Sequence, residues 1–204
     1  HALNGDRIEF DLINTFYDLC EEVVTDAKGA KNYEEFLFNS IRFFSVEPEI
    51  DTAEFTRISI PELTEKLYHH VYDAYLRKSK YIMQQTLPVL QEIRNSRGTE
   101  VRNVLIPFTD GNKNVNILVN LDKALSSNGK EVVKAFEQNI ILAFIDQAWK
   151  DHLRAMDELK QSVQLATIEQ KDPLLIYKFE AFKTFKAMMS DVNREVSSFL
   201  LKGQ

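Results

Sequence analysis

The segment that decides the fold spans residues 130–204 and contains two long amphipathic stretches. Residues 130–163 read KEVVKAFEQNIILAFIDQAWKDHLRAMDELKQSV, and residues 172–200 read DPLLIYKFEAFKTFKAMMSDVNREVSSFL. In the first stretch, a mainly apolar row recurs at steps of three and four, at Phe136, Ile140, Phe144, Ala148, His152, Met156, Leu159 and Val163. A second row lies beside it, at Ile141, Ile145, Trp149 and Leu153. The spacing predicts a helix whose apolar stripe is wider than one partner helix covers.

The second stretch predicts another long helix. Its row also recurs in threes and fours, at Leu174, Tyr177, Ala181, Phe185, Met188, Val192, Val196 and Phe199. Asp172 suits the N-cap because its carboxylate accepts free backbone N–H groups, and Pro173 suits the first helical position, where its missing N–H costs nothing. Because the polar link is short, the two helices are expected to run antiparallel as an αα-hairpin.

Bulk composition excludes several classes of protein. The chain has 204 residues, 27% of them charged, and a formal net charge of −6, which argues against nonspecific binding to nucleic acid. One cysteine, Cys20, allows neither an internal disulfide nor a cysteine-based zinc site, and is compatible with a reducing compartment. No apolar run is long enough to span a bilayer and no signal peptide is visible. Since His1 stands where an initiator Met would, we expect a fragment of a larger protein.

The residues before this segment predict further helices. Residues 6–25 show one apolar face, and this helix is expected to end at Lys28-Gly29. Residues 51–57 allow one or two helical turns, because Asp51 and Glu54 have capping-box spacing. A capping box at residues 32–35 precedes a short helix, and another at residues 59–62 starts a long one. The expected buried positions of these helices are Ile8, Leu12, Phe16, Leu19, Cys20, Val23, Phe36, Leu37, Ser40, Ile41, Phe44, Leu63, Leu67, Val71, Ala74, Tyr75 and Ile82.

Two features of the middle of the chain are expected to interrupt its helices. Pro88 removes a backbone hydrogen bond and is expected to kink or break the long helix. Residues 95–99 form a cluster of helix-breaking residues. Residues 101–121 are the one β-like stretch: alternating apolar residues flank Asp110-Gly111, a strong hairpin signal. An isolated hairpin is only marginally stable, so it is expected to pack on the helices or on another chain.

Catalytic candidates are few. The sequence has no phosphate-binding loop, dinucleotide fingerprint, nucleophile elbow or zinc-protease motif. Asp151, His152 and Asp157 could suggest a base or a metal site, but adjacent residues on a helix point about 100° apart. His152 is therefore expected at the edge of the apolar face with its ring hydrogen-bonded, and the adjacent His69 and His70 are also expected to diverge. We predict no catalytic residue and no metal site.

The aromatic residues of the second helix leave two interpretations open. Phe179 and Phe182 fall off the main apolar row. One interpretation is a thick core that buries them, which is the commoner outcome. The other is an exposed apolar strip that contacts a second partner.

Ordered sequence blocks in this segment carry a resemblance to a known family. They are WKDHLRAMD from Trp149, LKQSVQL from Leu159, QKDP from Gln170 and YKFEAF from Tyr177. Their order and spacing resemble the C-terminal helical region of SecA, the preprotein translocase motor. The resemblance covers most of residues 136–199; residues 1–130 resemble the end of the scaffold helix followed by the helical wing domain.

The resemblance implies an all-α fold with a helical wing and scaffold, a two-helix finger at about residues 134–199, and one inserted β-hairpin. Two regions are expected: residues 1–130, with the wing and the hairpin, and residues 131–204, with the scaffold and finger. ATP and Mg²⁺ would be used by nucleotide-binding domains upstream, so this fragment is expected to hold no cofactor and to hydrolyse no ATP. The implied location is the cytoplasm, peripheral to the inner membrane.

The implied partners are the SecY channel, the preprotein, and the upstream domains of the same chain, with no nucleic acid. The implied polypeptide contact is the finger tip, Leu165, Ala166, Thr167, Ile168, Glu169, Gln170 and Lys171. The packing and regulatory face would comprise Trp149, His152, Leu153, Met156, Tyr177 and Phe182. Ile168 stands where the family usually has a tyrosine, which favours a sequence-tolerant apolar contact.

Two other hypotheses compete with this one. A free-standing helical adaptor or holdase could use Phe179 and Phe182 to bind peptides. An enzyme could use Asp151, His152 and Asp157. The hairpin at residues 101–121 has no counterpart in the common family pattern and is interpreted as a lineage insertion.

Overall fold

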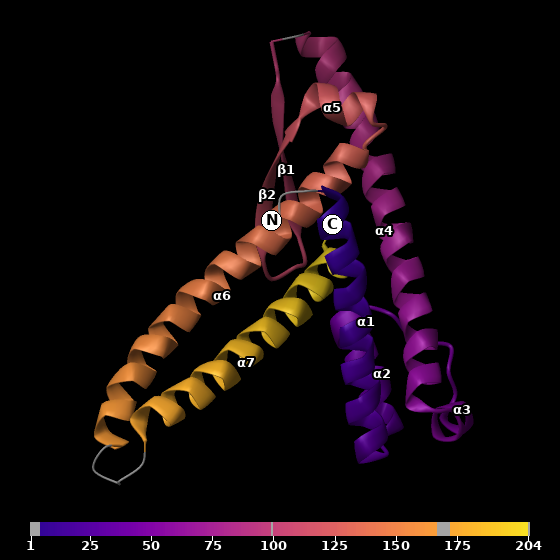
Figure 1. Ribbon diagram of the computed structural model, residues 1–204. Helices are drawn as coiled ribbons and strands as arrows, with labels where there is room; N and C mark the ends of the chain where they lie inside the picture. Colours follow the sequence, from indigo (N-terminus) through magenta and orange to yellow (C-terminus); the bar gives the residue numbers. More distant parts are fainter. Residues whose placement is uncertain (1–4, 99, 167–171, 204) are drawn as a thin grey trace. The chain divides into compact units, whose positions relative to one another are not determined.

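The computed structural model describes residues 5–98, 100–166 and 172–203, with side chains from residue 12 onward and without those of residues 164–166. Figure 1 shows the order of the elements. They are α1 (Gly5–Ala30), α2 (Tyr33–Phe44), α3 (Thr52–Arg57), α4 (Ile60–Arg97), β1 (Asn103–Thr109), β2 (Asn114–Asn120), α5 (Leu121–Ser126), α6 (Lys130–Ala166) and α7 (Pro173–Lys202). The chain forms two compact units, one of His1–Ile140 with Ser197–Gln204 and the other of Ile141–Val196.

The core of the first unit lies where α1 packs along α4 (Figure 1). Edge-to-face ring pairs join these helices, Phe16 with Tyr75 at 5.6 Å and Tyr17 with Tyr68 at 5.5 Å between centroids. The predicted apolar faces of the two helices are buried at Leu12, Phe16, Leu19, Cys20, Val23, Leu63, Leu67, Val71 and Ile82. Burial raises the pKa of the Cys20 thiol, so this residue is core filling, as its position on an apolar face predicts.

The predicted helix starts are confirmed at three N-caps. The side chains of Asn32, Asp51 and Ser59 accept hydrogen bonds from the backbone N–H groups three residues later. Each satisfies one of the donors that the first helical turn leaves without a partner. Ile41 of α2 is an exception to the predicted faces, since 49% of its surface is exposed.

Two expected helix ends are wrong. The first helix ends at Ala30 and not at Lys28-Gly29. The left-handed residue that follows it is Lys31, with a φ of 53°. The long helix does not break at Pro88 and continues to Arg97, so residues 95–97 are helical and Gly98, at φ 60°, follows the end. Pro88 is tolerated because it and Gln84, whose carbonyl loses its partner, both lie on the exposed face.

The predicted β-hairpin is confirmed. β1 and β2 pair antiparallel in a register that places Leu105 opposite Leu118 and Pro107 opposite Asn116. In the turn, a carboxylate oxygen of Asp110 accepts hydrogen bonds from the backbone N–H groups of Asn112 and Lys113, at 2.9 and 2.7 Å.

The turn carboxylate gives a pH prediction. Partial burial by itself raises the pKa of Asp110, but the backbone N–H groups of Lys113 and Asn112 and the Lys113 charge outweigh it and lower the pKa. A carboxyl whose folded pKa is depressed contributes stability above its unfolded pKa and loses it as pH falls through the folded pKa. We therefore expect Asp110→Asn to lower the thermal midpoint at pH 7 and the difference from wild type to shrink below about pH 4. A difference that grows on acidification would contradict this.

The hairpin packs on the helices, as its marginal stability in isolation requires. Its inner face buries Phe108, Ile117 and Val119. The ring of Phe108 lies 4.4 Å from that of Phe136 at the start of α6, and Phe136 lies 6.2 Å from Phe199 near the end of α7. These three rings join the hairpin to both ends of the helical segment within the first unit.

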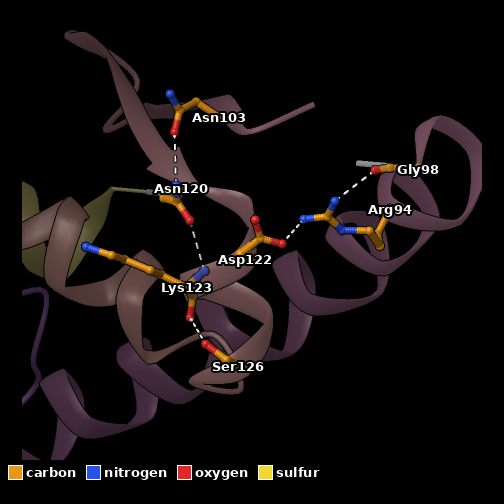
Figure 2. Close-up of polar contacts among 7 residues, drawn as sticks. All are labelled: Arg94, Gly98, Asn103, Asn120, Asp122, Lys123 and Ser126. Carbon is orange, nitrogen blue, oxygen red and sulfur yellow. Dashed lines mark hydrogen bonds and ion pairs between the residues drawn. The ribbon is translucent and has the colours of Figure 1, made fainter. Parts of the chain in front are cut away.

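The short helix α5 was missed by the sequence analysis. Figure 2 shows how it is held: the Asn120 side chain caps it through the Lys123 N–H at 3.0 Å, and Arg94 of α4 forms an ion pair with Asp122. Six residues give too little periodicity to detect. The signal that could have found it is Asn120, a polar cap directly before Leu121.

Candidate functional site

The candidate site lies on the second unit, where α6 and α7 meet through the predicted inner row of each helix. The ring of His152 packs edge-to-face on Phe185, with centroids 5.9 Å apart. Val163 and Val192 are buried, and Met156 and Tyr177 are half-buried. Leu174 and Phe185 are exceptions to the predicted row of α7, since 60% and 41% of their surface is exposed. The antiparallel helical hairpin is therefore confirmed, with His152 inside it.

His152 has surroundings that do not fit catalysis. Its ring lies 5.6 Å from that of Trp149. The hydrogen bond expected for this ring is not found at Nδ1, which is buried without a partner among the described residues. Asp151 points elsewhere and binds Arg154 and Gln147, at 2.7 and 2.9 Å. Asp157 is exposed. The residues that an enzyme would have used are therefore not brought together, and within the described ranges no group of three metal-ligating side chains occurs.

The second predicted row of α6 faces solvent. Trp149 is 47% exposed and Leu153 is 49% exposed, and Leu142 and Ile145 are similar. One row therefore packs on α7 while the adjacent row has no cover in this structure. This is the outcome expected of a stripe wider than one partner helix.

The off-row phenylalanines of α7 are exposed as well. Phe179 and Phe182 expose 67% and 62% of their surface, as does Leu175 at 67%. The thick-core interpretation is therefore wrong for the residues that the structure describes, because the second unit consists of two helices and leaves these rings exposed. Lys186 covers part of Phe182, with its ammonium 5.7 Å from the ring centroid.

The exposed rows of the two helices point to the same side. At 100° per residue, Trp149 and Leu153 lie roughly 60° and 100° around α6 from His152 of its inner row. Phe182 and Phe179 lie roughly 100° and 160° around α7 from Ala181 of its inner row, in the same rotational sense. Because the helices run antiparallel, equal senses of rotation turn both rows toward one face. We call Ile145, Trp149, Leu153, Phe179 and Phe182 the apolar band.

The predicted site residues divide into three groups. His152, Met156 and Tyr177 contribute to packing between the helices, whereas Trp149, Leu153 and Phe182 belong to the exposed band. Of the predicted tip, Leu165 and Ala166 end α6, and residues 167–171 lie outside the described residues. Leu142, Leu175 and Lys186 were not among the predicted site residues, although each continues an exposed row at a step of three or four.

These features define a class of protein: an α-helical scaffold module that carries a long antiparallel helical hairpin. No described helix has the length and apolarity needed to cross a bilayer. The whole chain, residues 1–204, matches the SecA Wing and Scaffold domain. The chain belongs to the SecA family, and it represents the wing and scaffold region of that family.

Individual relatives agree with this assignment. The protein translocase subunit SecA of Christiangramia forsetii is 45% identical over 204 residues, and that of Bacteroides thetaiotaomicron is 40% identical over 204 residues. The subunit from Flavobacterium psychrophilum is 45% identical over 203 residues. Each match covers 100% of this chain and 18% of the relative. The chain thus spans about a fifth of the length of these relatives.

Proposed function

We propose that this chain is the non-catalytic wing, scaffold and two-helix-finger part of a protein-translocating motor. In this proposal, other domains of a longer protein hydrolyse ATP with Mg²⁺. The finger transmits their motion to an unfolded preprotein at the cytoplasmic mouth of the SecYEG channel. The protein would work in the cytoplasm, peripheral to the inner membrane.

The observation that supports this best is the length of α6. α6 runs without interruption for 37 residues, and a helix of that length is about 55 Å long. A motor that moves arbitrary sequences gains little from a selective pocket and much from a stiff element with a tolerant surface. The apolar band is such a surface, since it offers area without directional hydrogen bonds.

The test uses the full-length protein with a cysteine at Ile168, the position of the predicted tip. During ATP-driven translocation, a photoreactive group on that cysteine is expected to crosslink to the channel and to the preprotein. The matched control is a cysteine at Phe38, which is exposed on α2. Equal crosslinking from both positions, or none from 168, would contradict the finger-tip role.

A second candidate function is a peptide-binding adaptor or holdase. Exposure of Phe179 and Phe182 favours it, because a contiguous exposed apolar strip commonly marks a binding surface. If it holds, the isolated chain binds peptides on an array and Phe179→Ala weakens that binding. Full binding by Phe179→Ala would rule this candidate out.

A further inference from the structure

The β-hairpin has two edges, and they differ in their capacity to pair with another strand. Leu121 N–H donates to the Arg102 carbonyl at 2.9 Å, and Asp110 N–H donates to the Lys113 carbonyl at 3.3 Å. Together with the register, these bonds place even-numbered residues of β1 and odd-numbered residues of β2 in the hydrogen-bonded pairs. The backbone groups of the alternate residues therefore point outward, away from the partner strand.

The outer edge of β1 is blocked. Pro107 is one of its outward residues, and proline has no N–H to offer to an added strand. Natural sheets use proline in this way to protect an edge from pairing.

The outer edge of β2 has no such protection. Its outward residues at the centre are Asn114, Asn116 and Leu118, and the side chains of all three are exposed. Within the described ranges, no backbone group of these residues bonds to another element. No residue of β2 is charged or a proline, and these are the usual devices that block an edge. At the far end, Asn120 is engaged, because its side chain caps α5 and lies 3.5 Å from Asn103 (Figure 2).

The outer face of the hairpin is uncharged and partly apolar. Leu105 and Leu118 lie opposite each other there, 62% and 57% exposed. Their neighbours on this face are also neutral, namely Asn103, Pro107, Thr109, Asn114, Asn116 and Asn120. If a strand were added beside β2, its side chain opposite Leu118 would contact the apolar pair of Leu105 and Leu118 and no charged group.

We propose that the outer edge of β2 is a strand-addition site for an extended segment of unfolded polypeptide. Residues 114, 116 and 118 offer three N–H and three C=O groups, which a segment of about five extended residues can pair with. Recognition rests on the main chain, so it accepts many sequences, with a preference for an apolar residue beside Leu118. The proposal rests on the proposed function only for the source of the segment, a preprotein in transit.

A second copy of the chain suits this edge less well. The antiparallel self-pairing that uses only the three free positions sets Asn114 opposite Leu118 and Asn116 opposite itself. This arrangement forms no apolar cross-strand pair, and such pairs are the unit of sheet stabilisation. The register that sets Leu118 opposite itself would pair Asn116 with Asn120, and α5 already uses Asn120 as its N-cap.

The test is binding of a labelled peptide to the 204-residue chain. The probe is an eight-residue peptide of alternating valine and threonine, followed by fluorescence anisotropy. The matched probe is the same peptide with every backbone amide N-methylated, so that neither of its edges offers an N–H group for pairing. We expect saturable binding that falls by about tenfold or more on N-methylation, since several main-chain bonds of about 1 kcal/mol each are lost.

Two variants locate the site. Asn116→Pro removes an outward N–H of β2 and is expected to weaken binding by about tenfold. Asn103→Pro makes the same change on the blocked edge, opposite Asn120 and away from the Leu105–Leu118 pair, and is expected to leave binding unchanged. Amide hydrogen exchange provides a readout on the wild-type chain: the N–H groups of Asn116 and Leu118 become protected when peptide is added.

Three results would overturn the proposal. They are an absence of saturable binding, equal affinity for the N-methylated peptide, and protection of Asn116 and Leu118 by self-association at high protein concentration without peptide. None of these results bears on crosslinking from position 168 in the full-length protein, so failure here is distinguishable from failure of the proposed function.

Discussion

Phe136→Ala is expected to lower the free energy of unfolding by about 3–5 kcal/mol. The ring is 2% exposed and lies between Phe108 of the hairpin and Phe199 of α7. Removing it leaves a cavity that three separate elements line, and they cannot all move in to fill it. Urea unfolding of the chain, followed by circular dichroism, gives the value.

The control for this variant is Phe38→Ala, which removes the same group from a site that is 62% exposed. Its expected effect is within about 0.5 kcal/mol, as for most surface substitutions. If Phe136→Ala cost no more than Phe38→Ala, the three-ring cluster would not be what holds the hairpin and the two helix ends together.

Ala148→Pro in the full-length protein is expected to abolish preprotein translocation while ATP hydrolysis continues. Proline inside a helix costs about 3 kcal/mol or more and bends it. The substitution also leaves the carbonyl of Phe144 without its partner, and Phe144 is 8% exposed, so water cannot readily replace the lost bond. Translocation of a labelled preprotein into membrane vesicles and phosphate release measure the two activities.

Ala148→Ser is the matched control, because serine is small and keeps the helix intact at a cost of about 0.5 kcal/mol. It is expected to retain translocation. A proline variant that moves preprotein as fast as the serine variant would show that an unbroken α6 is not needed to transmit motion.

Local chemistry was predictable from the sequence. Short motifs identified the helix caps and the hairpin turn, because each involves hydrogen bonds between residues at most four apart in the chain. These are the caps Asn32, Asp51 and Ser59 and the turn at Asp110-Gly111. The tolerance of Pro88 was not predictable, because it depends on which side of α4 faces solvent.

The candidate site was predictable only in part. The spacing of the two rows of α6 predicted that one partner helix would be too narrow, and exposure of Trp149 and Leu153 agrees. Whether Phe179 and Phe182 are covered depends on how many elements surround α7, and that number is a property of the tertiary structure. The free edge of β2 could not be identified from the sequence either. The N–H groups that point outward from a hairpin can be assigned only when the register of its two strands is known.

The central claim is that α6 and α7 form one stiff, doubled-back pair. The most direct test is the distance between spin labels on cysteines at Lys150 and Ala187, both exposed, measured by pulsed electron resonance. Antiparallel packing predicts one narrow population below about 30 Å, since packed helices lie 8–10 Å apart and each label adds several ångströms. A broad distribution, or one centred near the roughly 55 Å that 37 residues of continuous helix would span, would contradict the account.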